Sequence, residues 1–258
     1  MILVLDAGNT NIKLGVYEGR HLLHSWRMAT DDTKTSDEYG MQLLAYFSFS
    51  GISTGDISGV IISSVVPSIN YTLEHMINYF LHQKPLVVGP GVKTGINIKY
   101  ENPREVGTDR ICNAVAAFEL YGGPLVYIDF GTATTFGAVN AKGEFLGGAI
   151  CAGIKVSTEA LSEKASRLPK IELECPPTVI NRSTLTNVQA GVIYGYVGQV
   201  DYIADRMKEE LGAPNAPVVA TGGQAAIIAG ITKTKIHMHP ELTLDGLRII
   251  YERNQQRT

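Results

Sequence analysis

The stretch MILVLDAGNT, residues 1–10, is an apolar run that ends at an aspartate and passes into a short glycine-containing turn. Apolar residues alternate again over residues 12–17, so the segment predicts a strand, a tight turn and a returning strand. The pattern occurs a second time in LVYIDFGTATT, residues 125–135. The aspartates Asp6 and Asp129 are 129 − 6 = 123 residues apart, close to half of the 258-residue chain. A repeat at this distance indicates a duplicated domain, because solenoid repeats recur every ~20–50 residues.

Each of the two turns has the residue types that a phosphate site needs. Glycine lets a phosphate oxygen approach backbone N–H groups, and asparagine and threonine side chains supply further donors. Asp6 could also hold Mg²⁺ through water, since this ion takes few carboxylates and several phosphate oxygens. For one such segment taken alone, an ordinary hairpin turn explains the residues equally well.

A third glycine-containing segment, Thr221-Gly222-Gly223, follows another short apolar run. Glycine there could admit a ribose or an adenine ring, while the two aspartate turns, facing each other across a cleft, could clamp a polyphosphate. The GxxxxGK[ST] loop and the HRD and DFG sequences of protein kinases do not occur in the chain, so a Walker site and a protein-kinase site are excluded. The ordered trio predicts a nucleotide-binding protein of another type.

The composition excludes several other classes of protein. With 22 Lys and Arg against 25 Asp and Glu, the net charge is −3, so the chain has no basic excess for nucleic acid. Three widely separated cysteines fit neither a disulfide framework nor a zinc knuckle. The amino-terminal residues do not read as a signal peptide, and no run of ~18 apolar residues predicts a spanning helix. We therefore expect a cytoplasmic protein without nucleic-acid or membrane partners.

Apolar periodicity predicts strands and helices through both halves of the chain. The predicted strands beyond the two hairpins are residues 59–66, 85–88 and 218–220. The predicted helices are residues 36–49, 71–81, 109 to about 120 with Thr108 as its cap, 187–211, one beginning near 224, and 244–251. Residues 89–102 and 168–183 are expected to be loops.

The segment Gly107-Thr108-Asp109-Arg110 carries a candidate general base. Phosphorylating a hydroxyl requires positioning, charge neutralisation and an acceptor for the hydroxyl proton. Asp109, at the start of a predicted helix, lies near the positive end of the helix dipole, which favours its ionised form. Arg110 could bind the carboxylate of an acidic substrate in a fork. The alternative is that Asp109 is an ordinary first-turn residue that only complements the dipole.

Together these motifs resemble the superfamily of actin, sugar kinases and heat-shock chaperone ATPases. More narrowly, nearly the whole chain resembles a type III pantothenate kinase, on DAGNT at residues 6–10, GTDR at 107–110 and DFGTATT at 129–135. The resemblance implies an α/β fold of two duplicated ribonuclease H-like domains, residues 1–115 and 116–258. Each domain would have a mixed sheet flanked by helices, with ATP in the cleft between them. One departure is Ala152-Gly153, where the family usually has Pro-Gly.

The resemblance also implies roles for individual residues. Asp109 would be the base, and Asp129 would hold a monovalent cation, K⁺ or NH₄⁺. The residues implied to bind ATP are Asp6, Ala7, Gly8, Asn9, Thr10, Asn11, Ile12, Lys13, Thr132, Gly222 and Gly223. Those implied to bind pantothenate are Tyr100, Gly107, Thr108, Asp109, Arg110 and Thr184.

The activity that follows from the resemblance is ATP- and Mg²⁺-dependent phosphorylation of the primary hydroxyl of pantothenate to 4′-phosphopantothenate, the first step of coenzyme A biosynthesis. Two alternatives stay open. One is a non-catalytic nucleotide-binding regulator resembling an accessory transcription factor, and the other is a kinase for another small hydroxy acid. The helix at 187–211 is apolar on more than one face, which predicts a homodimer. Thr184 of one chain would then reach the Asp109 site of its partner.

Three further features have simple explanations. His237 and His239 alternate across Met238 and could bind a metal, but without a third ligand they are expected to be ordinary strand or surface residues. Cys112 is expected to be a buried thiol. The charges of residues 206–210 are expected to lie on a solvated helix face.

Overall fold

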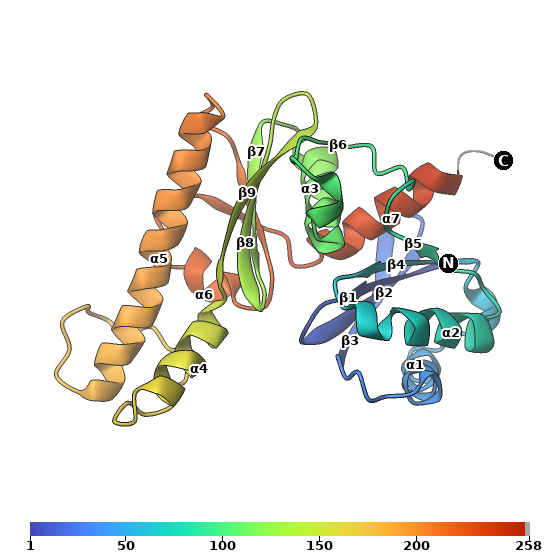
Figure 1. The fold of residues 1–258 in the computed structure, drawn as a ribbon, viewed down its shortest axis with the longest axis horizontal. Coiled ribbons are helices and arrows are strands. Elements are labelled where there is room, and N and C mark those ends of the chain that lie inside the picture. Colours follow the sequence, from blue (N-terminus) through green and yellow to red (C-terminus); the bar gives the residue numbers. More distant parts are fainter. Residues whose placement is uncertain (256–258) are drawn as a thin grey trace. The chain divides into compact units, whose positions relative to one another are not determined.

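The computed structural model describes residues 1–255 and contains two compact units, each built around its own sheet (Figure 1). Unit 1 consists of Met1–Gly95, Glu101–Ala116 and the described residues from Glu241 onward, and unit 2 of Ile96–Tyr100 and Ala117–Pro240. The predicted boundary between residues 115 and 116 lies beside one of these divisions. The carboxyl-terminal segment, predicted to belong to the second domain, instead packs in unit 1.

Unit 1 contains a five-stranded mixed sheet in the order β3-β2-β1-β4-β5. Strand β1 pairs antiparallel with β2, which pairs antiparallel with β3, while β4 runs parallel to β1 and β5 parallel to β4. The strands are β1 Ile2–Ala7, β2 Asn11–Glu18, β3 His21–Ala29, β4 Gly59–Ser64 and β5 Leu86–Val87. This register places Asp6 of β1 opposite both Lys13 of β2 and Ser63 of β4.

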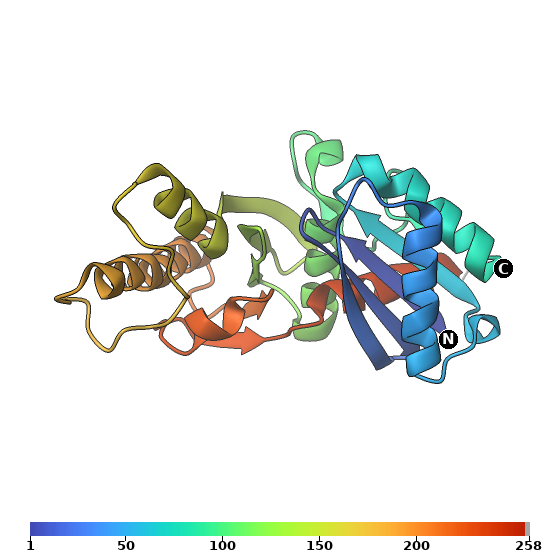
Figure 2. The ribbon, with the colours of Figure 1, turned by 90° about the horizontal axis from the view of Figure 1, so that it is seen from below.

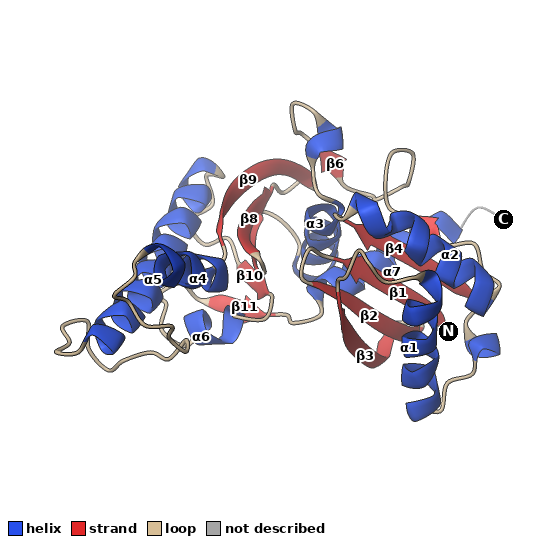
Figure 3. Ribbon diagram, turned by 60° about the horizontal axis from the view of Figure 1, so that its bottom comes forward, coloured by secondary structure: helices blue, strands red, loops and turns tan. Residues whose placement is uncertain are grey.

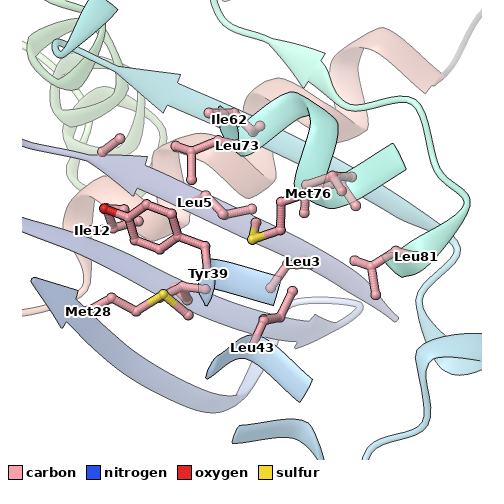
Figure 4. Close-up of a cluster of buried hydrophobic side chains, with 14 of the residues drawn as sticks. Leu3, Leu5, Ile12, Met28, Tyr39, Leu43, Ile62, Leu73, Met76 and Leu81 are labelled. Atoms are coloured by element: carbon pink, nitrogen blue, oxygen red, sulfur yellow. The ribbon is translucent and has the colours of Figure 1, made fainter. Parts of the chain in front are cut away.

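Helices cover both faces of this sheet, which is why β1 is an unbroken apolar run rather than an alternating one. On one face α1 (Ser36–Phe49) and α2 (Asn70–Leu81) enclose a core with alternate residues of β1, Leu3 and Leu5 (Figure 4). On the other face lies α7 (Leu242–Gln255), whose Leu244 approaches Gly15 beside Val4. Figure 2 shows α1 and α7 on opposite sides of the blue strands.

The ends of the helices in unit 1 follow local sequence signals. A capping box starts α1, because the Thr35 hydroxyl accepts from the Glu38 amide and the Glu38 carboxylate accepts from the Thr35 amide. The helix α3 (Thr108–Tyr121) begins at Thr108 itself. Thr108 was predicted to cap this helix, but its hydroxyl instead donates to the carbonyl of Ser64, at 3.1 Å. Short 3₁₀ turns lie at Thr54–Asp56, Pro67–Ile69 and Pro103–Glu105.

Unit 2 contains a six-stranded mixed sheet in the order β11-β10-β7-β8-β9-β6. Its strands are β6 Asn97–Ile98, β7 Leu125–Phe130, β8 Ala133–Val139, β9 Glu144–Ala152, β10 Val218–Thr221 and β11 Ile236–Met238. The helices α4 (Ile154–Lys164), α5 (Thr184–Glu210) and α6 (Ala225–Ala229) lie together on one side of β8–β11 (Figure 3). Residues of α5 and α6 share a core with alternate residues of β7 and β10.

The two sheets repeat one topology. In each, three antiparallel strands in sequence, β1-β2-β3 or β7-β8-β9, are extended beside the first by two parallel strands, β4-β5 or β10-β11. The predicted duplication of an α/β domain with a mixed sheet and flanking helices is confirmed.

Several local predictions differ from the structure. Helix α5 begins at Thr184, three residues before the predicted start, because Ser183 is its cap and accepts from the Thr186 amide at 3.2 Å. The strands β3 and β9 and the helix α4 were not predicted; β3 alternates between exposed and half-buried residues, and β9 contains two adjacent glycines. Within the predicted loop 89–102, β6 pairs with β9.

Candidate active site

The β1–β2 turn in unit 1 is built as an open loop with exposed polar side chains. The Gly8 amide donates to the Asn11 carbonyl at 3.1 Å, and the Thr30 hydroxyl donates to the Gly8 carbonyl at 2.6 Å. Asn9, Thr10 and Asn11 are exposed. Of the other residues predicted to bind ATP, Ala7 and Ile12 are fully buried, and Ile12 points into the core of Figure 4. Ala7 and Ile12 therefore offer a ligand their backbone only.

Asp6 lies at the end of β1 and is buried, with 6% of its surface exposed. The register places Lys13 and Ser63 on the same side of the sheet as Asp6, which is the side that α7 covers. Because Mg²⁺ prefers few carboxylates and retains water and phosphate oxygens, one aspartate at a strand end is a suitable anchor for it. Among the described residues, no group of three or more His, Cys, Asp or Glu side chains could hold a metal ion by itself.

The first turn of α3 presents the predicted base. The Asp109 carboxylate accepts from the Arg110 amide at 2.8 Å, so the side chain folds back over its own helix start. A Cβ at position 107 would lie 2.5 Å from the same Asp109 oxygen, so only glycine leaves room for this conformation. Asp109 is half-buried, whereas Arg110 is buried, with 5% of its surface exposed.

Asp6 and Asp109 are joined through the residues beside them. Ser63 lies next to Asp6 in the register, and its Oγ is 2.9 Å from Oγ1 of Thr108, the residue before Asp109. Burial raises the pKa of the Cys112 thiol well above its usual value, and the Asp6 and Asp109 carboxylates raise this pKa further. The structure therefore gathers in unit 1 the phosphate-turn aspartate and the candidate base, which are 103 residues apart (109 − 6 = 103). The expectation that Cys112 is a buried thiol is confirmed.

In unit 2, the second and third sequence motifs meet. Thr221 of β10 lies beside Asp129 of β7, and a Cβ on Gly222 would lie 2.5 Å from the Phe130 backbone. Gly222 has φ +99°, a conformation that other residues rarely adopt. Nothing lies within 4 Å of the Cβ position of Gly223, so the backbone there is accessible to a ligand.

The β7–β8 turn is tied to the segment in which the chain departs from the family pattern. The Gly153 amide donates to the Thr132 carbonyl at 3.0 Å, and a Cβ at Gly153 would lie 2.2 Å from that oxygen. The Tyr196 hydroxyl donates to the carbonyl of Ala152. The Thr132 side chain itself is exposed and Asp129 is half-buried. With alanine at position 152, this segment still forms a close backbone contact with the turn.

Tyr100 is held by an aromatic stack within unit 2. Its ring lies parallel to that of Phe145, with centroids 6.4 Å apart, and Phe145 stacks in turn on the buried Tyr127. Beneath Tyr100 lies Gly147, whose Cβ position would be 3.5 Å from the ring and whose φ is +120°. Sequence reasoning gave no role to Phe145 or Gly147, although the adjacent glycines at 147 and 148 are a signal that could have pointed to this segment.

The remaining predicted residues lie elsewhere. Thr184 is the exposed first residue of α5. His239 pairs through Nδ1 with the Tyr121 hydroxyl at 2.9 Å, and the ring of His237 also lies against Tyr121. Arg206 forms ion pairs with Glu209 and Glu210 on the outer side of α5, as expected for a solvated face. No helix among residues 1–255 is both long and apolar enough to span a bilayer.

Comparison with known proteins is consistent with this arrangement. The family model of type III pantothenate kinases matches residues 2–206. Among solved structures, a Campylobacter jejuni protein described as a Baf family transcriptional activator aligns with a TM-score of 0.64 and 18% identity, covering 99% of this chain and 100% of that one. A Sinorhizobium meliloti protein described as a 2-dehydro-3-deoxygalactonokinase aligns with a TM-score of 0.60 and 9% identity, covering 100% and 98%.

The ROK hexokinase of Thermus thermophilus aligns with a TM-score of 0.54 and 14% identity, covering 99% of each chain. At such identities these three likenesses show the fold alone. They place the two repeated sheets in the fold shared by actin-like sugar kinases.

Proposed function

The chain belongs to the type III pantothenate kinase family and is accordingly a kinase, and we propose that it phosphorylates the primary hydroxyl of pantothenate to give 4′-phosphopantothenate. ATP with Mg²⁺ is the phosphoryl donor that this family implies. The observation that carries the proposal is the link in unit 1 between the Ser63 beside Asp6 and the Thr108 before Asp109. It brings a candidate anchor for Mg²⁺ near a candidate base, as transfer from ATP to a hydroxyl requires.

Asp109 would accept the hydroxyl proton of the substrate as the new P–O bond forms. Its position in the first turn of α3 favours the ionised carboxylate, since the helix dipole is positive there. The bond from the Arg110 amide orients the Asp109 carboxylate at the start of the helix. The guanidinium of Arg110 would bind the substrate carboxylate, with Gly107 and Thr108 beside it.

The donor would be held largely by backbone groups and exposed polar side chains. In unit 1, the amides around Gly8 and the side chains of Asn9, Thr10 and Asn11 would contact phosphate oxygens. Mg²⁺ at Asp6 would neutralise phosphate charge when bound. Lys13 would add a positive charge on the same side of the sheet.

In unit 2, the exposed Thr132 and the open backbone at Gly222 and Gly223 would contact ATP. Asp129 would hold K⁺ or NH₄⁺, which would further offset the phosphate charge. Tyr100, held on Phe145, would lie against pantothenate.

The direct test measures ADP release over a panel of small hydroxy acids, with and without potassium. Turnover restricted to pantothenate supports the proposal. Turnover with a different hydroxy acid identifies another acceptor, and ATP binding without turnover on any acid supports the non-catalytic alternative. Either of the last two results overturns the assignment of pantothenate.

We also propose that the chain works as a homodimer with shared sites. Unit 2 exposes large apolar side chains on β9, α4 and α5, namely Leu146, Ile150, Val156, Leu161, Leu185 and Tyr202. A second copy could cover such a surface. In the resulting C₂ dimer, Thr184 of one chain would complete the Asp109 site of its partner.

Complementation between two inactive variants tests the shared site. Asp109→Asn and Thr184→Arg should each be nearly inactive alone. After both are unfolded, mixed and refolded, half of the dimers are mixed and half of their sites carry no defect, so about a quarter of the activity should return. A mixture no more active than its parents, though mass measurement shows mixed dimers, contradicts the proposal.

A further inference from the structure

Ser63 is a polar residue that the fold buries completely, with none of its surface exposed. It is the fifth residue of β4, one position before the strand ends, and lies directly beside Asp6 of β1. None of the roles proposed above uses it. A hydroxyl in this position is costly unless it is hydrogen-bonded, so its partners indicate what it does.

Ser63 takes part in a series of hydrogen bonds that joins β4 to α3. Its Oγ lies 2.9 Å from Oγ1 of Thr108, and Oγ1 of Thr108 lies 3.1 Å from the carbonyl oxygen of Ser64. These bonds connect Thr108, the first residue of α3, to two consecutive residues of β4.

Counting the donors shows which group donates in each of these hydrogen bonds. Each hydroxyl has one hydrogen, and that of Thr108 points to the Ser64 carbonyl. The hydrogen between Ser63 and Thr108 must then come from Ser63. Both hydroxyl hydrogens are then used, and the series of bonds ends on the Ser64 carbonyl of β4.

Thr108 immediately precedes the candidate base, Asp109, at the start of α3. The first turn of α3, closed by the Ile111 amide donating to the Gly107 carbonyl at 3.2 Å, is therefore attached to the sheet through the residue before Asp109.

We propose that Ser63 is a positioning residue that fixes the first turn of α3 against β4 and thereby holds Asp109 in place to accept the substrate proton. The inference rests on the proposed function, because it takes Asp109 as the base. A misplacement of about 1 Å in a reacting group can cost ~10²-fold in rate. Loss of the Ser63 hydroxyl should therefore lower kcat while ATP binding is retained.

The test compares Ser63→Ala with Ser58→Ala, which removes an exposed hydroxyl that donates to the Met1 carbonyl just before β4 begins. Ser63→Ala should lower kcat by about tenfold or more, with the KM for ATP within about twofold of the wild-type value. Ser58→Ala should match the wild type. Ser63→Cys, which keeps a weak donor, should recover part of the lost kcat and also serves if the alanine variant does not fold.

A double-mutant cycle that combines Ser63→Ala with Asp109→Asn shows whether Ser63 acts through the base. In that background Ser63→Ala should cause no further loss of kcat, because there is no carboxylate left to position. Losses that multiply instead show that Ser63 acts independently of Asp109, and they overturn the inference.

Hydrogen exchange gives a readout that needs no turnover. Exchange of the Ile111 amide should be at least about tenfold faster in Ser63→Ala and unchanged in Ser58→Ala. Unchanged exchange in Ser63→Ala refutes the attachment of α3 to β4. A wild-type protein inactive on pantothenate refutes the proposed function instead, so the two failures are distinguishable.

Discussion

The β1–β2 turn of unit 1 and the β7–β8 turn of unit 2 start from the same pattern, an aspartate, a glycine and a threonine after an apolar strand. Both connect the first two strands of sheets with the same topology, yet their surroundings differ. Asp6 is buried, with Ser63 of β4 beside it, and Ser63 in turn contacts Thr108, the residue before Asp109. Asp129 is half-buried, and the Phe130 that follows it packs against Gly222.

This difference shows what the neighbouring elements add to a duplicated strand–turn–strand. In unit 1 a helix start supplies a carboxylate, which is suited to proton transfer. In unit 2 a second glycine turn supplies accessible backbone, which is suited to binding a nucleotide. Substitutions made in one unit at a time separate these roles.

The largest effect is expected from Gly8→Val. A Cβ at this position would lie 3.2 Å from the Asn11 carbonyl, which the turn can accommodate by a small shift, but the branched side chain covers the amides that would meet a phosphate. Calorimetry should detect no ATP binding although the protein stays folded. Gly55→Val, in an exposed 3₁₀ turn where a Cβ would meet the Ser53 hydroxyl at an ordinary contact distance of 3.8 Å, is the control and should bind ATP normally. Unchanged affinity in Gly8→Val contradicts the phosphate role of the first turn.

Asp109→Asn is expected to reduce turnover by ~10²-fold or more while ATP still binds, because the amide keeps the size of the side chain and loses its basicity. Steady-state kinetics and calorimetry on the same preparation measure the two effects. Turnover near that of the wild type would remove Asp109 from the mechanism and make it a residue that only complements the helix dipole.

Replacing potassium by sodium should strongly lower activity, and adding potassium or ammonium should restore it, if Asp129 holds the monovalent cation. In Asp129→Asn the activity should be low and independent of the cation, since the carboxylate that attracts it is absent. A wild-type enzyme that is indifferent to the monovalent ion would leave the second turn without this role.

The smallest effect concerns stability and compares the glycines of the two units. Gly222→Ala places a Cβ 2.5 Å from the Phe130 backbone at a φ of +99°, so the free energy of unfolding should fall by about 1–3 kcal/mol. Gly8→Ala, with its Cβ at 3.2 Å from one carbonyl oxygen, should cost less. Urea denaturation of both variants measures the two free energies of unfolding. Equal losses would contradict the tighter packing around Gly222.

Much of the architecture was predictable because its signals are local. The helix at Ser36–Phe49 was predicted to the residue, since its apolar spacing and its boundaries lie within one stretch of sequence. The strands of the two hairpins were predictable for the same reason. By contrast, the sequences of β3 and β9 contain polar or glycine residues that interrupt the apolar pattern, although their burial alternates, and their strand structure depends on pairing with β2 and β8.

The candidate site was predictable in its residue types and less so in its partners. Gly8, Asp109 and Gly222 stand in recognisable motifs. By contrast, the residues on either side of Ser63 and Phe145 in the sequence do not indicate which residues these two side chains contact. Thr108 was predicted to be a helix cap because serine and threonine often are, but the end of β4 offers its hydroxyl a carbonyl partner and the helix starts one residue earlier.

The sequence by itself determined the duplicated α/β fold, the two aspartate turns and the position of the candidate base. Periodicity, turn residues and a repeat of 123 residues are all properties of the order of the chain. Only the tertiary structure decided that the terminal helix α7 packs in unit 1, with Gly246 so close to the Cys112 carbonyl that a Cβ would lie 2.1 Å from it. It also decided that the Ser63 beside Asp6 meets the Thr108 before Asp109. Such contacts depend on which surfaces remain to be covered once the sheet has formed, and residues far apart in sequence meet there because burial rewards packing regardless of chain separation.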